Sequence, residues 1–192
     1  MPALIEITTG QLRLSGLYIV PIQIGVLVLL LLIATAVDIR ERRIPNWLVA
    51  TGMTGALAFH SISLQGEGAV FALSGLAVGM ATLLPMYALG VMGAGDVKLM
   101  GMIGAFLGMD GVFGAVLASM AAGGLLALGF AACKRMLPQM FINLLDILRH
   151  FHIKHMTRSI TAPMAPVASI GKMPYAVAIT AGTLAQLTFL HL

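Results

Sequence analysis

The chain of 192 residues is 59% hydrophobic and only 9% charged, and its mean hydropathy is +1.00. Soluble domains carry about a quarter of their residues as charged side chains, so the composition excludes a soluble globular protein. The net charge of +4 comes without a basic stripe interleaved with aromatic residues, and we therefore expect no nucleic-acid partner. The single cysteine, Cys133, allows neither an internal disulfide nor a thiolate-bound zinc site.

Apolar stretches of about 20 residues, enough to cross a hydrocarbon layer of roughly 30 Å, recur along the chain. We predict five such spans, at residues 17–37, 47–64, 69–90, 111–133 and 173–190. A sixth stretch, residues 97–109, is shorter, because about 13 residues make roughly 20 Å of helix. If this helix reaches the far interface, its other end begins in a recess that protein must line.

The Lys and Arg residues predict the orientation, because basic connections stay in the cytoplasm. They gather in the first, third and fifth connections: Arg40, Arg42, Arg43, Lys98, Lys134, Arg135, Arg149, Lys154, Arg158 and Lys172. The opposite connections, at 65–68 and Asp110, contain none. We therefore predict an all-α polytopic membrane protein, with residues 1–192 forming one bundle of six transmembrane helices and both termini periplasmic.

The fifth connection contains apolar and charged residues interleaved at helical spacing over residues 138–156. This pattern predicts an amphipathic helix lying on the cytoplasmic surface of the membrane. Residues 157–169 are rich in Thr, Ser, Ala and Pro, which indicates a flexible segment, either a lid or a tether.

Two aspartates stand in this apolar setting, Asp38 after the first span and Asp96 within Gly-Ala-Gly-Asp-Val-Lys. A carboxylate near bilayer depth is costly and usually faces a polar cavity. The predicted topology puts both on the cytoplasmic side, which suggests a reaction centre. Each has a plainer interpretation: Asp38 pairs with Arg40 at the interface, and Asp96 is the N-cap of the next helix.

Two motifs carry a resemblance to a known family. Asp-x5-Ile-Pro-Asn spans residues 38–46 directly after the first span, and Gly-x-Gly-Asp-x-Lys spans residues 93–98 before a later helix. Their order and setting resemble those of the type IV prepilin peptidases, membrane aspartic proteases of the GxGD group. The chain is similar to the short form found with tight-adherence (Flp-type) pili, and the resemblance covers nearly all of it.

The resemblance implies an endopeptidase that removes the basic leader of a prepilin at the cytoplasmic face of the bacterial inner membrane. Asp38 and Asp96 would be its catalytic pair, and no metal or organic cofactor is expected. The expected partner is the transmembrane helix of a prepilin or pseudopilin within the lipid bilayer. Longer family members carry paired Cys-x-x-Cys motifs and methylate the new N-terminus. The chain lacks those cysteines, so the resemblance does not extend to N-methylation.

The other residues of the two motifs have structural interpretations. Gly93 and Gly95 let the chain turn and pack closely. Lys98 is expected to extend toward the lipid headgroups, with substrate binding as a lesser option. Pro45 and Asn46 are expected to start the second helix, Pro fixing the turn and Asn capping it.

Glycines spaced four apart predict close helix packing elsewhere in the bundle. They are Gly75 with Gly79 and Gly104 with Gly108. His60 is expected to be a hydrogen-bonded packing residue.

Two other functions remain open from the residues alone. An ion- or proton-coupled transporter also uses intramembrane carboxylates, although it would place them near the midplane between internal repeats. A non-catalytic pilus assembly factor would tolerate the loss of either aspartate. The sequence does not fix the oligomeric state.

Overall fold

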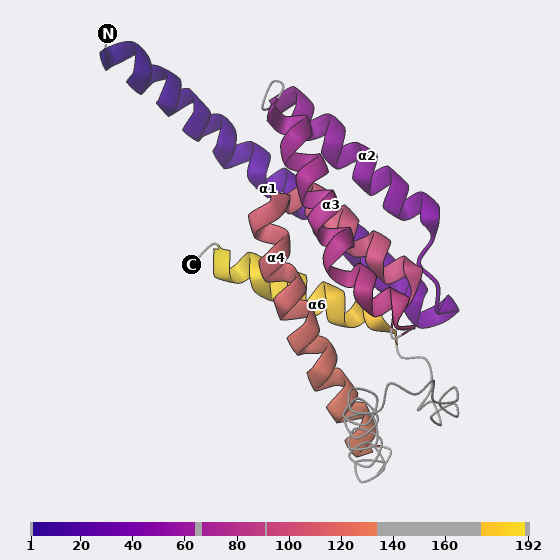
Figure 1. The fold of residues 1–192 in the computed structure, drawn as a ribbon. Helices are drawn as coiled ribbons and strands as arrows, with labels where there is room; N and C mark the ends of the chain where they lie inside the picture. The colour runs from indigo at the N-terminus through magenta and orange to yellow at the C-terminus, as the bar shows by residue number, and fades with distance from the viewer. Residues whose placement is uncertain (1, 64–66, 91, 134–173, 191–192) are drawn as a thin grey trace, which may run out of the picture. The chain divides into compact units, whose positions relative to one another are not determined.

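The computed structural model describes residues 2–63, 67–90, 92–133 and 174–190 (Figure 1). Within those ranges the chain forms helices and no strands. The helices are α1 (Pro2–Glu41), α2 (Asn46–Ser63), α3 (Glu67–Ala88), α4 (Ala94–Cys133) and α6 (Tyr175–Leu190). The all-α prediction agrees with these residues. The amphipathic segment predicted at 138–156 and the segment at 157–169 lie outside them.

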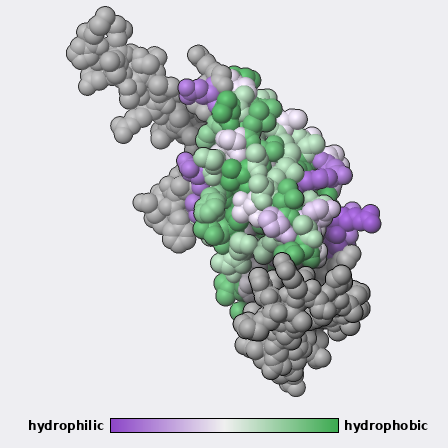
Figure 2. All heavy atoms as spheres, viewed as in Figure 1, coloured by the Kyte–Doolittle hydropathy of each residue, from purple (hydrophilic) through white to green (hydrophobic). Residues whose placement is uncertain are grey.

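Three of the described helical segments are long and apolar enough to cross a membrane: Ile22–Glu41, Glu67–Ala88 and Ala94–Phe130. Large apolar side chains such as Leu29, Leu73 and Phe113 are more than half exposed, as lipid contact requires. Figure 2 shows apolar residues over much of the described surface, with few hydrophilic ones. The chain is therefore a transmembrane protein, whereas six crossings and periplasmic termini stay predictions.

The chain divides into two compact units, Met1–Ala122 with Pro174–Leu192, and Gly123–Met173. All residues of the two motifs belong to the first unit. Of the second unit the structure describes residues 123–133, which form the last turns of α4. The description below concerns the first unit.

The first half of α4 is the central element of this unit. Every residue from 99 to 106 is buried, and Leu99, Met100, Met102 and Ile103 are fully inaccessible. Apolar side chains of the surrounding helices complete the core: Leu27, Leu31, Leu48, Ala56, Leu83 and Ile179. Asp96 lies at the start of this buried helix, so its position is set by the best-packed part of the unit.

The helical stretch of α4 contains one non-helical residue, Gly108, with φ 72° and ψ −177°. Only glycine adopts this backbone conformation readily, and a Cβ here would collide with the ring of Phe71. The sequence predicts that one span ends at residue 109 and that the next begins at 111. The structure puts the interruption at Gly108 and continues helically through Asp110.

Close backbone contact joins α3 to α4, as the glycine spacing predicts. A Cβ on Gly75 would collide with the carbonyl oxygen of Gly104, and the converse holds for Gly104. One turn along, a Cβ on Gly79 would meet the carbonyl oxygen of Met100 at 2.5 Å. Such contact maximises dispersion between helices that gain little from burial within lipid.

Hydroxyl groups bind α6 to its neighbours. Thr35 of α1 and Thr180 of α6 share a hydrogen bond of 2.7 Å, and the Thr180 hydroxyl is 3.4 Å from the carbonyl oxygen of Leu31. From α4, Ser119 donates to the carbonyl oxygen of Ile179 at 3.3 Å. These bonds fix the register of α6 along α1, and therefore the position of its first turn.

Candidate active site

Asp38 lies in the last turn of α1 and is only 7% exposed. Its Oδ2 atom accepts a hydrogen bond from the main-chain N–H of Ala176 at 3.2 Å, so the buried carboxylate is bound by the first turn of α6. Its main-chain carbonyl accepts from the N–H of Arg42 at 2.8 Å, which closes the end of α1. Arg42 adopts φ 53°, a left-handed conformation that glycine usually supplies at a helix end.

Asp96 lies in the first turn of α4 and is half-buried. Its Oδ2 atom accepts from the N–H of Gly93 at 3.1 Å, while its own N–H donates to the carbonyl of Gly93 at 3.1 Å. This reciprocal pair resembles a capping box, in which the third helical residue binds back to the N-cap. The interpretation of Asp96 as the N-cap is wrong: α4 begins at Ala94, and Gly93 occupies the capping position.

The two carboxyl groups lie near enough for their charges to interact. They reach this place from residues far apart in sequence, one at the end of a helix and the other at the start of a different one. Each has a buried apolar residue nearby on its own helix: Ala34 lies one turn before Asp38, and Val97 directly follows Asp96.

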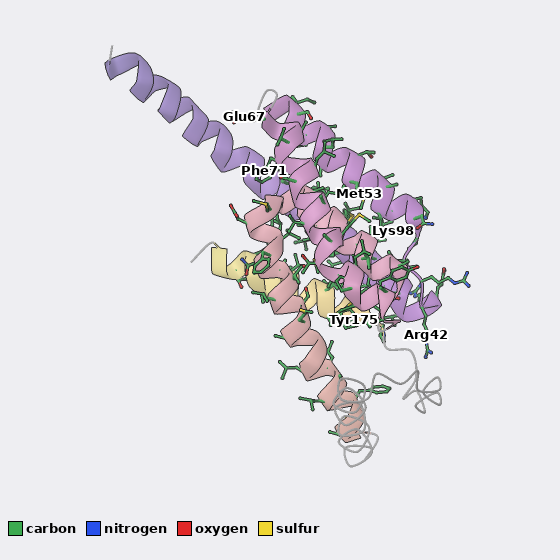
Figure 3. All side chains as sticks on the ribbon, in the orientation of Figure 1. Arg42, Met53, Glu67, Phe71, Lys98 and Tyr175 are labelled. Carbon is green, nitrogen blue, oxygen red and sulfur yellow. The ribbon has the colours of Figure 1, made fainter. Side chains whose placement is uncertain are left out.

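The two motifs also contact each other outside the aspartates. Lys98 Nζ donates to Asn46 Oδ1 at 3.0 Å, joining the first turn of α4 to the start of α2; Figure 3 labels Lys98 at this position. A Cβ on Gly95 would meet Cβ of Ile44 at 3.2 Å, so the glycine lets α4 approach the α1–α2 turn. The motif residues therefore hold the two aspartate-bearing segments against one another.

These contacts correct the expectation for Asn46 and add a protein partner for Lys98. Asn46 does not cap α2: the helix starts at Asn46, and the carbonyl of Pro45 accepts the first helical hydrogen bond, from Val49 N at 3.4 Å. The Asn46 side chain instead accepts the hydrogen bond from Lys98. The Lys98 ammonium thus has a partner within the protein, and its extension toward the headgroups stays a prediction.

Metal ligation finds no support among the described residues, where no three His, Cys, Asp or Glu side chains come together. His60 is buried, and its Nε2 lies 3.2 Å from the carbonyl oxygen of Phe106. Its ring packs against those of Phe59 and Phe71. The prediction that His60 is a hydrogen-bonded packing residue is confirmed.

Sequence reasoning missed the contribution of α6 to the site. Ala176 binds Asp38 through a main-chain amide, which leaves no signature in the choice of side chain. The neighbouring Tyr175 is half-buried and lies within electrostatic range of Asp96. The only available signal was a tyrosine directly after Pro174, at the point where the last predicted span begins.

Comparison with known families agrees with this geometry. The sequence profile of the type IV leader peptidase family matches residues 25–128, which include both motifs and the whole of α2 and α3. The chain belongs to this family. Family membership supports a prepilin peptidase-like protease in a membrane, as the motifs predicted. No curated protein and no solved structure matches the chain.

Proposed function

We propose that the protein is an aspartic endopeptidase in which Asp38 and Asp96 activate the water that cleaves the substrate. The observation that supports this proposal is that the two carboxyl groups, one from each motif, lie near enough for their charges to interact, and that Asp38 is buried. Family membership supports proteolysis in general. The aspartic mechanism and these two residues are the proposal itself.

The reaction follows from the chemistry of a carboxyl pair that holds one proton. The ionised carboxylate takes a proton from water as the water oxygen bonds to the scissile carbonyl carbon. The protonated partner then gives its proton to the leaving nitrogen as the C–N bond breaks. One proton enters the pair and one leaves it, so the pair returns to its starting state after each turnover.

The substrate class follows from the family and from the topology predicted by the basic residues. We infer that the substrate is a Flp-type prepilin, whose transmembrane helix lies in the bilayer beside the enzyme. Its basic leader would be cut at the cytoplasmic face of the inner membrane. A transporter or an assembly factor is less well supported, because the matched family is defined by peptidases.

The test replaces each aspartate with an isosteric amide. Asp38→Asn and Asp96→Asn should each lower the cleavage of a Flp-type prepilin peptide by at least about 1,000-fold, because neither amide can transfer the proton. Initial rates in detergent, measured per folded protein, give the comparison. Asp110→Asn is the matched control, since Asp110 is exposed and outside both motifs.

Wild-type cleavage by either variant contradicts the catalytic pair. The absence of cleavage by the folded wild-type protein, tested on several Flp-type prepilins, contradicts the peptidase function.

A further inference from the structure

The first turn of α6 binds Asp38, one residue of the proposed catalytic pair, although it lies outside the region that the family profile matches. That match ends at residue 128, and α6 begins at Tyr175. Ala176 nevertheless donates its main-chain N–H to Asp38 Oδ2 at 3.2 Å. The site therefore includes a segment whose contribution the family match does not cover.

This turn is fixed by bonds that do not involve the side chain of Tyr175. Besides the bond from Ala176 N to Asp38, the hydroxyl of Thr35 lies 3.4 Å from the carbonyl oxygen of Ala176. The same hydroxyl pairs with Thr180 at 2.7 Å, one turn further along α6. Both main-chain polar groups of Ala176 are thus held by α1, which gives the adjacent Tyr175 a defined position. A catalytic group needs such a rigid support.

The side chain of Tyr175 extends this contact to the second aspartate. It is half-buried, packs against the apolar core, and lies within electrostatic range of the Asp96 carboxylate. Figure 3 labels it at the start of α6. The first turn of α6 therefore binds Asp38 through the main-chain amide of Ala176, and it carries a phenol within electrostatic range of Asp96.

Resting on the peptidase function above, we propose that Tyr175 is a third catalytic group, whose hydroxyl donates a hydrogen bond to the oxygen of the scissile carbonyl. When water adds, its oxygen bonds to the carbonyl carbon, its proton passes to a carboxylate, and the π electrons move onto the carbonyl oxygen. The phenol keeps its proton and stabilises this developing negative charge. As the C–N bond breaks, the electron pair returns to re-form the carbonyl.

Tyr175→Phe tests this role, because it removes the hydroxyl and keeps the ring that packs against the core. Loss of one oxyanion donor should lower kcat for a Flp-type prepilin peptide about 100-fold, with KM and Tm unchanged. Tyr87→Phe is the matched control, since Tyr87 is exposed in the last turn of α3 and should retain the wild-type kcat.

A second measurement separates catalysis from packing. A peptide inhibitor with a tetrahedral hydroxyl-bearing carbon at the cleavage position mimics the addition intermediate. Tyr175→Phe should weaken its binding by about the same factor as kcat/KM falls, and should leave the binding of the uncleaved substrate to the Asp96→Asn background unchanged.

The outcomes distinguish a failure of the proposed role of Tyr175 from a failure of the proposed peptidase function. A Tyr175→Phe variant with wild-type kcat, or one whose loss is matched by Tyr87→Phe or by a fall in Tm, overturns the role of Tyr175. If Asp96→Asn is inactive in the same assay, the peptidase function stands. A wild-type protein that cleaves no prepilin overturns both.

Discussion

The motif end of the molecule and the middle of the α3–α4 contact are held together in opposite ways. At the motif end, a few hydrogen bonds between distant segments fix the two aspartates: Ala176 to Asp38, Gly93 to Asp96 and Lys98 to Asn46. In the α3–α4 contact, glycine backbones touch directly and no side chain intervenes. The comparison indicates that close backbone packing joins α3 to α4, whereas hydrogen bonds between distant segments position the two aspartates.

The largest expected effect comes from filling the glycine contact. Gly75→Val should lower stability by about 3 kcal/mol or more, because its Cβ would collide with the main-chain carbonyl of Gly104, which has no flexible side chain to move aside. Thermal unfolding in detergent measures this loss. Gly55→Ala is the control: no atom lies within 4 Å of its Cβ position, and the better helix propensity of alanine predicts equal or higher stability. Equal Tm values for the two variants would contradict the claim that the close contact at Gly75 stabilises the protein.

A smaller effect is expected when the aspartates are truncated. Asp38→Ala should lower stability by about 2 kcal/mol, because it leaves the buried N–H of Ala176 without its acceptor and loosens α6 from α1. Asp96→Ala should lower it by about 1 kcal/mol, because the bond that it removes is local and exposed. Amide hydrogen exchange should rise at the start of α6 only in the Asp38 variant. An equal rise in both would contradict the assignment.

The hydrogen bond between Lys98 and Asn46, which joins the two motifs, gives a third prediction, about the reaction rate. Lys98→Met and Asn46→Ala should each lower kcat/KM about 10-fold, and the double variant should lose little more, because both remove the same 3.0 Å bond. Stability should change by less than about 1 kcal/mol, since Asn46 is exposed and Lys98 is partly exposed. Lys98→Arg retains a donor and should recover part of the activity. Fully additive losses would show that the two residues act separately.

The smallest expected effect has the opposite sign. Arg42→Gly should raise stability by about 0.5–1 kcal/mol, because glycine adopts φ 53° without the strain of a Cβ. Arg43→Gly, next along the exposed turn and without a positive φ, should lower stability slightly. A shift of both Tm values in the same direction would indicate that the strain at Arg42 is relieved by other contacts.

Much of the candidate site was predictable from the sequence. Aspartates beside long apolar stretches are rare, so Asp38 and Asp96 indicate where a site lies. Composition predicted the membrane class, and the two motifs predicted the family. The glycine spacing likewise predicted the close α3–α4 contact, since Gly75 and Gly104 have no Cβ and therefore allow two helix backbones to approach closely. These features depend on residue type and local spacing, which a sequence displays directly.

The rest depends on tertiary placement, which spacing does not encode. The sequence does not show that Asn46 accepts a hydrogen bond from Lys98 instead of capping its own helix, because an asparagine side chain can do either. The hydrogen bond from Ala176 to Asp38 could not be predicted from the sequence for another reason. Its donor is a main-chain N–H, and almost every residue has one. Gly108 illustrates a third limit, since Asp110 looked more like the end of a helix than the glycine before it.

The bond between Ala176 and Asp38 has a consequence for biosynthesis. It joins residues 138 positions apart, so Asp38 emerges from the ribosome long before its donor exists. A nascent chain that has inserted α1 to α4 carries both aspartates yet lacks the turn that holds one of them. The surroundings of Asp38 are therefore completed only after α6 is made, and a chain interrupted between α4 and α6 would carry both aspartates without the amide that binds Asp38.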